Sequence, residues 1–274
     1  MPDLVRVGLF LVSASAVLGS SLVLVSALRL TGSATILALW IVAAAQTVLV
    51  AQALSILNAL DWPGFLLGHL AIAVGALIWS RRWSPAEPGR AVTEIRAGLG
   101  RFTDVAWDRR APALAILATA TLLAGLVGAV LAVWVPPNDW DSVVYHMSRV
   151  GYYLQFRSLD HYPTSNIHQV LYPANAEILI LWTVAFLHSD RLANTIELAA
   201  WAVTTVAVYG VGRQIGLGAR AALFGAGVFA LLPQSILLST TTKNDLVLTS
   251  FLVVSLFFLF DAAEGARFIA PSLE

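Results

Sequence analysis

The chain has 274 residues, of which 58% are hydrophobic and only 12% charged, and its acidic and basic residues balance at sixteen each. Soluble domains carry about 25% charged residues, so much of this protein's surface faces an environment other than water. A net charge of zero offers no field that would attract nucleic acid. The absence of cysteine excludes disulfides, thiolate metal sites and cysteine nucleophiles. The composition predicts an all-α protein, a polytopic transmembrane helix bundle.

The first part of the chain is strongly apolar. An apolar stretch of about 20 residues is long enough to cross a bilayer as a helix. Three such stretches follow one another at 7–28, 35–57 and 63–79. The first of them exceeds the core of a signal peptide, which is about 7–15 residues long. Residues 1–80 are therefore predicted to be an N-terminal transmembrane extension of three helices.

Residues 81–111 have a different composition. They contain seven arginines against four acids, together with Pro85 and Pro88. Arginine and lysine are enriched in the cytoplasmic loops of membrane proteins. We therefore predict a basic cytoplasmic loop, whose partner would be the anionic surface of the lipid bilayer.

A second group of apolar segments lies in residues 112–274. One of them, 174–187, is too short to span and is predicted to be a re-entrant or interfacial helix. If Arg213 and Arg220 are cytoplasmic, the number of crossings places residues 136–173 and the polar tip at 243–245 together on the outer side. The segments long enough to span are 112–135, 192–211, 221–240 and 246–263.

The outer loop, residues 136–173, is the most polar and aromatic segment of the chain. Its first two prolines stop the preceding helix, and either Asn138 or Asp139 is a favourable N-cap for a new one. The residues that follow are amphipathic at helical spacing, which predicts an interfacial helix over 143–156. The predicted apolar stripe comprises Val143, Met147, Val150 and Leu154, and the opposite face carries Asp141, Tyr145, Ser148, Arg149 and Tyr152.

Two structural interpretations of this loop stay open beside a functional one. An aspartate at the start of a helix is often only a cap. Tyrosines near a membrane surface also form ordinary aromatic belts. The second outer tip, with Lys243 and Asp245, favours function, because acids at membrane depth are costly to keep.

Three features, in this order, resemble those of a known family. The span 112–135 leads into an outer loop in which Asp141 precedes Tyr145 by four residues. A short proline-led helix follows, LYPANAEILILW. A later helix ends in the Gly-Arg turn YGVGRQIG, and the next leads to Asp245 in TTTKNDLVLTSF. Over residues 114–261 the chain resembles the GT-C superfamily of polytopic, polyprenyl-phosphate-sugar-dependent glycosyltransferases, which includes protein O-mannosyltransferases and lipid A aminoarabinose transferases.

The resemblance implies an enzyme of the bacterial cell envelope, a multi-pass protein of the inner cell membrane. It would move a sugar from a polyprenyl-phosphate donor to a glycan, lipid or protein acceptor on the outer face. Asp141 would be the catalytic base, with Asp139 as an alternative because the motif is doubled as NDWD. Asp245 would assist the base or help to hold a divalent metal ion, the one cofactor implied, whose ligands stay unknown.

The departing phosphate would need cationic or hydrogen-bonding groups beside it. Arg149, His146, Tyr145 and Lys243 are the candidates for substrate and phosphate binding, and arginine matches phosphate best in geometry. Each of them could equally be a bystander. His161 and His168 have no recognisable metal-ligand spacing.

Two departures from the family leave other functions open. The three helices of residues 1–80 are an extension, and family members usually continue past the outer acid with helices that bind the lipid carrier. We therefore expect the GT-C-like core, residues 112–274, to be incomplete at its C-terminus and too short to be active alone. The alternatives are a non-catalytic partner in envelope polysaccharide assembly and a transporter or flippase with Asp141, Glu197 and Asp245 along a path. A transporter would be expected to show paired broken helices, which the sequence lacks.

Overall fold

The computed structural model describes residues 3–83 and 89–269, without the side chains of residues 83 and 263–269. Residues 84–88 of the predicted basic loop and 270–274 of the predicted core lie outside the described residues. Every regular element in the described part is helical, which confirms the all-α class. The elements are α1 (Asp3–Ala27), α2 (Ser33–Ile56), α3 (Trp62–Trp83), α4 (Arg90–Ala106), α5 (Pro112–Trp134), η1 (Ser142–Met147), α6 (Ser148–Phe156), α7 (His168–Leu171), α8 (Asn175–Leu187), α9 (Thr195–Gln214), α10 (Ala219–Leu231), α11 (Pro233–Leu238) and α12 (Asp245–Ile269).

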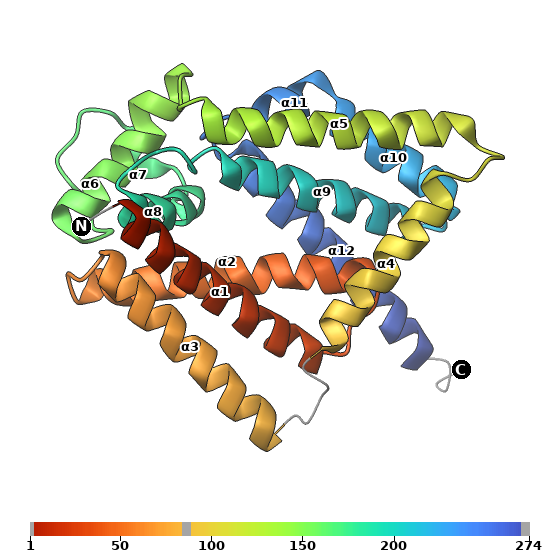
Figure 1. The fold of residues 1–274 in the computed structure, drawn as a ribbon, viewed down its shortest axis with the longest axis horizontal. Helices are drawn as coiled ribbons and strands as arrows, with labels where there is room; N and C mark the ends of the chain where they lie inside the picture. The colour runs from red at the N-terminus through yellow and green to blue at the C-terminus, as the bar shows by residue number, and fades with distance from the viewer. Residues whose placement is uncertain (1–2, 84–88, 270–274) are drawn as a thin grey trace.

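Six helices of the described part are long and apolar enough to cross a membrane, namely α1, α2, α3, α5, α9 and α12. They run between two ends of the bundle, with α6, α7 and α8 at one end and α4 at the other (Figure 1). Leucines on α5 such as Leu122 and Leu126 are exposed rather than packed on protein. Large exposed apolar faces on long helices are typical of contact with lipid. The chain is therefore a multi-pass membrane protein by length and composition.

Helix α9 occupies the middle of the bundle, where it packs against α12, α10, α2 and α5 (Figure 1). Two glycines of the YGVGRQIG segment allow these close approaches. A Cβ atom on Gly210 would lie 2.6 Å from the Phe257 ring of α12, and one on Gly212 would lie 3.2 Å from Ala222 of α10. Small residues at helix contacts are a usual means of packing in membrane bundles.

The predicted span 221–240 is not one continuous helix. Helix α10 ends at Leu231 and α11 begins at Pro233, and Leu232 between them has an extended ψ of 131°. Proline lacks an N–H group, and its ring disfavours helical geometry in the preceding residue. The two short helices together return the chain from the α4 end to the opposite end (Figure 1).

The short apolar segment expected at 174–187 forms helix α8, which has 13 residues. Protein encloses it, because α8 packs against α1, α6 and α2 and its residues from Ala176 to Leu181 are buried. This position excludes a helix lying on a membrane surface. It also joins the N-terminal helices directly to the rest of the bundle.

The basic segment contains helix α4, which docks across the ends of α1 and α2. The Ala91 N–H donates to Ser26 Oγ at 3.1 Å, and Glu94 accepts a hydrogen bond from the Gly32 N–H at 3.4 Å. Arg220, in the first turn of α10, pairs with Asp108. The two arginine-containing segments predicted to share one side therefore lie at one end of the bundle.

Candidate functional site

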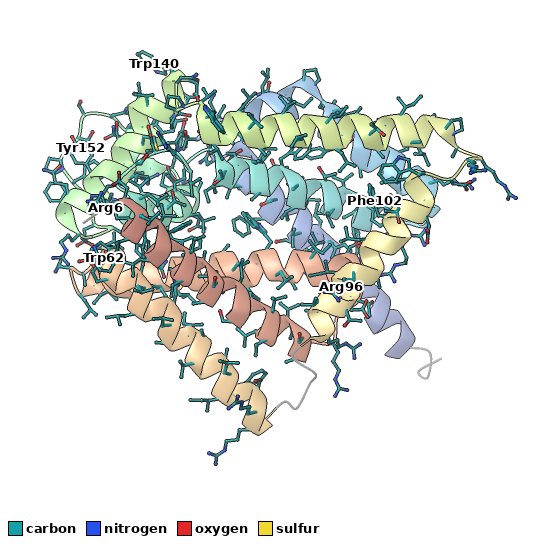
Figure 2. The ribbon with its side chains drawn as sticks, viewed as in Figure 1. Arg6, Trp62, Arg96, Phe102, Trp140 and Tyr152 are labelled. Atoms are coloured by element: carbon teal, nitrogen blue, oxygen red, sulfur yellow. The ribbon has the colours of Figure 1, made fainter. Side chains whose placement is uncertain are left out.

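The outer loop begins with a helix that is capped by Asp139. One carboxylate oxygen accepts a hydrogen bond from the Ser142 N–H at 3.2 Å, and the other accepts one from the Ser142 hydroxyl. Asp139 was one of the two predicted caps. The next residue, Trp140, is 78% exposed and points away from the bundle (Figure 2). Asp139 therefore has a structural role at the start of this helix.

The helix predicted over 143–156 is present, but it begins as the π-helical turn η1 and continues as α6. Val150 is buried and Met147 and Leu154 pack against the same core, whereas Val143 is exposed. Most of the apolar stripe thus faces protein, not a lipid surface. Arg149, expected on the polar face, is only 4% exposed. The wider π turn, closed by i→i+5 hydrogen bonds, shifts the helical phase relative to the 3.6-residue pattern assumed from sequence.

A chain of buried hydrogen bonds joins four distant segments around this turn. Asn194, before α9, donates from Nδ2 to the Val135 carbonyl at 3.0 Å and accepts from the Thr242 hydroxyl at 2.7 Å. The Thr242 N–H donates to Ser142 Oγ at 3.1 Å. Because buried polar groups are costly to leave unpaired, these bonds hold the two outer loops in a fixed relation. None of Asn194, Ser142 and Thr242 was among the predicted site residues.

Lys243 forms ion pairs between the tip at 243–245 and the loop at 136–173. Its ammonium nitrogen lies 3.0 Å from Asp141 Oδ2 and 3.5 Å from Asp139 Oδ1. The Asp141 side chain is 40% exposed, so it can meet a ligand from solution. Asp245 is the first residue of α12 and is also exposed. The structure thus brings Asp139 and Asp141 together with Lys243, and Asp245 begins α12 two residues after Lys243.

Tyr145 lies four residues after Asp141 on the same helix. Burial raises the pKa of Tyr145 to about 12, and the charges of Asp141 and Asp245 act in the same direction. The hydrogen bond to Asp141 raises the pKa of Lys243 above its usual value. At neutral pH the site therefore presents a protonated phenol and an ammonium group near Asp141.

Arg149 and His146, two of the predicted phosphate-binding residues, face the interior instead. Glu177 Oε1, on α8, lies 3.0 Å from His146 Nδ1 and 3.0 Å from the Arg149 NH1 nitrogen. Arg149 also donates to the Tyr172 carbonyl at 2.6 Å and to the Tyr153 hydroxyl at 3.0 Å. This leaves Lys243 and Tyr145 as the predicted ligand-binding groups that lie beside Asp141.

Glu177 was not among the predicted site residues, although the sequence contains a signal for it. It is an isolated acid in an otherwise apolar helix, and such acids are rarely kept without a partner. Glu177, His146 and Arg149 are all buried. They form a charged anchor between α8 and the helix that carries Asp141 and Tyr145.

Glu197, which the transporter alternative placed along a path, instead accepts hydrogen bonds from the backbone of α12. It is fully buried, and its carboxylate accepts the backbone N–H groups of Leu246 at 2.9 Å and Val247 at 3.2 Å. These N–H groups belong to the first turn of α12, where intrahelical partners are lacking. Glu197 therefore fixes the start of α12, directly after Asp245, and its burial does not suit a residue that lines a path.

A divalent metal ion does not fit this arrangement. Within residues 3–83 and 89–269, no group of three or more histidine, aspartate and glutamate side chains could hold a metal ion. The Lys243 ammonium contacts both Asp139 and Asp141, and it supplies the positive charge that a cation would bring.

The fold and the site define a helical membrane protein with a charged cluster at one end of the bundle. Comparisons of the chain with protein-family models, with curated proteins and with solved structures gave no match. The function must therefore be argued from the geometry of the cluster.

Proposed function

We propose that the protein is a membrane glycosyltransferase that takes a sugar from a polyprenyl-phosphate donor and acts at the end of the bundle that carries Asp141. The observation that carries the proposal is the pairing of Asp141 with Lys243 beside Tyr145 and Asp245. A carboxylate can take the proton of the acceptor, and an ammonium and a phenol can donate to the departing phosphate. These groups come from two segments of the chain that the hydrogen bond between the Thr242 N–H and Ser142 Oγ holds together, across a separation of 100 positions.

In the proposed reaction Asp141 is the general base. The acceptor hydroxyl oxygen attacks the anomeric carbon, and its proton passes to the Asp141 carboxylate. The bond between the anomeric carbon and the phosphate oxygen breaks, and the electron pair leaves with the polyprenyl phosphate. A positioned base contributes about 10²–10⁴ in rate. Asp141 suits this role better than Asp139, because both oxygens of Asp139 already accept hydrogen bonds from Ser142.

Lys243 and Tyr145 would act on the departing phosphate. Preformed donors aimed at a developing negative charge stabilise a transition state strongly in a partly dry site. The Lys243 ammonium is on a flexible stem, so it can move from Asp141 to the phosphate as the donor binds. Tyr145 keeps its proton at neutral pH and can donate a hydrogen bond. Asp245, exposed nearby, would orient the acceptor.

The proposed donor is membrane-associated, which suits a site at the end of a bundle of spanning helices. A donor held by a lipid tail presents its sugar at the depth of the headgroups. We place the reaction on the outer face of a bacterial inner membrane, in assembly of the cell envelope, because arginines gather at the opposite end of the bundle.

The test is transfer from polyprenyl-phosphate-linked sugars, measured as release of free polyprenyl phosphate by the purified protein in lipid nanodiscs. We expect Asp141→Asn to lower the rate about 10²–10⁴-fold. The matched control is Asp160→Asn, an exposed acid of the same loop, which should stay within about threefold of the unchanged protein.

Three outcomes would contradict the proposal. The unchanged protein releases no polyprenyl phosphate from any donor tested, Asp141→Asn keeps near-normal activity, or Asp160→Asn is as damaging as Asp141→Asn. Inactivity of Asp139→Asn beside an active Asp141→Asn would transfer the role of base to Asp139.

A further inference from the structure

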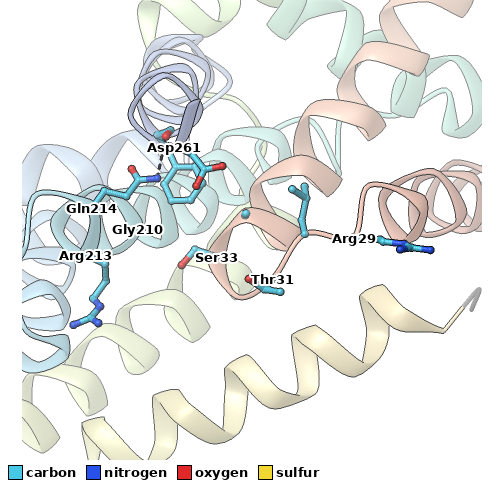
Figure 3. A pocket seen from close by; sticks show the side chains of 10 residues that line it. Arg29, Thr31, Ser33, Gly210, Arg213, Gln214 and Asp261 are labelled. Atoms are coloured by element: carbon cyan, nitrogen blue, oxygen red, sulfur yellow. Dashed lines mark hydrogen bonds between the residues drawn. The ribbon is translucent and has the colours of Figure 1, made fainter. Parts of the chain in front are cut away.

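The end of the bundle opposite Asp141 holds an open cavity of about 420 Å³ (Figure 3). It lies where the start of α2, the end of α9 and the middle of α12 meet. Its polar lining comes from Arg29, Thr31, Ser33, Arg213, Gln214 and Asp261. Gly210 forms part of the wall, where α9 passes close to Phe257.

The charges around this cavity favour an anion. Arg29 and Arg213 line it, and Figure 3 shows them on opposite sides of Thr31 and Ser33 with their guanidinium groups directed outward. The Arg213 NH1 nitrogen donates to the Leu217 carbonyl at 3.0 Å. Two further arginines lie at its rim. Arg90 donates to the Arg29 carbonyl at 3.5 Å, and an Arg101 nitrogen lies 3.7 Å from the Cβ position of Gly32. Among the residues that line the cavity, the charged ones are Arg29, Arg213 and Asp261, two positive against one negative.

A second hollow, of about 720 Å³ and almost wholly apolar, adjoins the cavity. Leu30 lines both, and the neighbouring Phe257 and Phe258 line one each. The walls come from α2 and α12, which are both long enough to cross a membrane, and their outer rim includes the exposed Leu28 and Leu259. An apolar groove between spanning helices can bind a hydrocarbon chain, because no polar group of the protein has to lose its water.

We propose that the two hollows are one binding site for an anionic phospholipid of the leaflet at the α4 end. Its phosphate would lie between Arg29 and Arg213, with hydrogen bonds from the Thr31 and Ser33 hydroxyls. One acyl chain would lie along Phe258 in the groove. The joining of a cationic polar cavity to an apolar groove selects an amphiphile over a free phosphate, which would leave the groove empty. The same charges select an anionic over a neutral phospholipid.

The absence of cysteine makes the test direct. A bimane fluorophore is attached to the Leu256→Cys protein, at an exposed position of α12 beside the groove but not in its lining. The labelled protein in detergent micelles is titrated with phosphatidylglycerol that carries a nitroxide on one acyl chain, and separately with the matching phosphatidylcholine. Quenching reports a chain in the groove. The same label on the Leu126→Cys protein reports non-specific contact with α5.

We expect phosphatidylglycerol to bind at the α12 label at least about fivefold more tightly than phosphatidylcholine, since each basic residue near a lipid surface attracts an anionic lipid by about that factor. Arg29→Gln and Arg213→Gln should each lower this preference about fivefold. Arg109→Gln, an exposed arginine that does not line the cavity, should leave it unchanged. Ser255→Phe, which narrows the groove from its exposed rim, should weaken quenching by both lipids.

Equal quenching by the two lipids would overturn the proposal, as would a preference that survives both arginine substitutions. An α12 label that no lipid quenches, while the α5 label is quenched normally, would overturn it too, because the groove would then be covered by protein.

Discussion

Glu177 provides the sharpest test of how the site is held in place. Its carboxylate is fully buried and is shared by Arg149, itself 4% exposed, and by His146. Glu177→Ala would leave the guanidinium of Arg149 buried without a counter-charge. Breaking one partner of a buried pair costs about 3–5 kcal/mol, because the remaining charge cannot return to water. We expect Glu177→Ala to lose free energy of unfolding in that range.

The measurement is unfolding of the purified protein in mixed micelles of increasing denaturing detergent, followed by tryptophan fluorescence. Asp104→Ala, at an exposed position on α4, is the matched control and should change the free energy by no more than about 0.5 kcal/mol. In the double variant Arg149→Leu with Glu177→Leu, no charge is left buried and unpaired. We expect that variant to be more stable than Glu177→Leu alone.

Two results would refute this reasoning. One is a Glu177→Ala protein within about 1 kcal/mol of the unchanged one, which would mean that Arg149 reaches water or another partner. The other is a double variant whose loss equals the sum of the two single losses, which would mean that the residues do not act as a pair.

Further outcomes are expected elsewhere in the chain. Cysteines at Ser165 and Asn244 should both react with an impermeant thiol reagent in intact cells, because their loops share one end of the bundle; protection of either until lysis would contradict the topology. Gly210→Ala should destabilise the protein by about 1–3 kcal/mol in the same unfolding assay, because its Cβ would meet Phe257 at 2.6 Å; a stability equal to the unchanged protein would contradict this close packing. Partial burial opposes ionisation of Asp139, but hydrogen bonds from Ser142 and the Lys243 charge lower its pKa below 3.8. The ionised Asp139 carboxylate therefore stabilises the folded protein above pH 3.8, the usual pKa of an aspartate. This stabilisation is lost as the pH falls through the lower pKa that Asp139 has in the folded protein. The stability difference between the unchanged protein and Asp139→Asn should shrink as the pH falls below 4, and a difference independent of pH would contradict the ionised cap.

The helical class and the approximate positions of most helices were accessible from sequence, because length and hydropathy are local properties. The short α8 was expected for the same reason. The break at Pro233 follows from a local steric rule, but a long apolar run concealed it. The sequence predicted the positions of helices better than it predicted which face of a helix is buried. The π turn at 142–147 puts Val143 out of phase with Val150 and Leu154, and Arg149 is buried because Glu177 pairs with it.

The sequence by itself determined that this chain is apolar enough to span a membrane, that nine of its fifteen arginines lie in the segments 81–110 and 213–220, and that its candidate site residues lie in the loops between spans. Only the tertiary structure decided which of those residues meet. Asp141 reaches Lys243, and Arg149 and His146 reach Glu177, through contacts between segments far apart in the chain. Hydrophobic periodicity reports which face of a helix is buried, and it carries no information on the partner against which that face packs. The pairing of charges depends on that partner. The residues of the site could therefore be proposed from the sequence, but the contacts between them are known only from the three-dimensional structure.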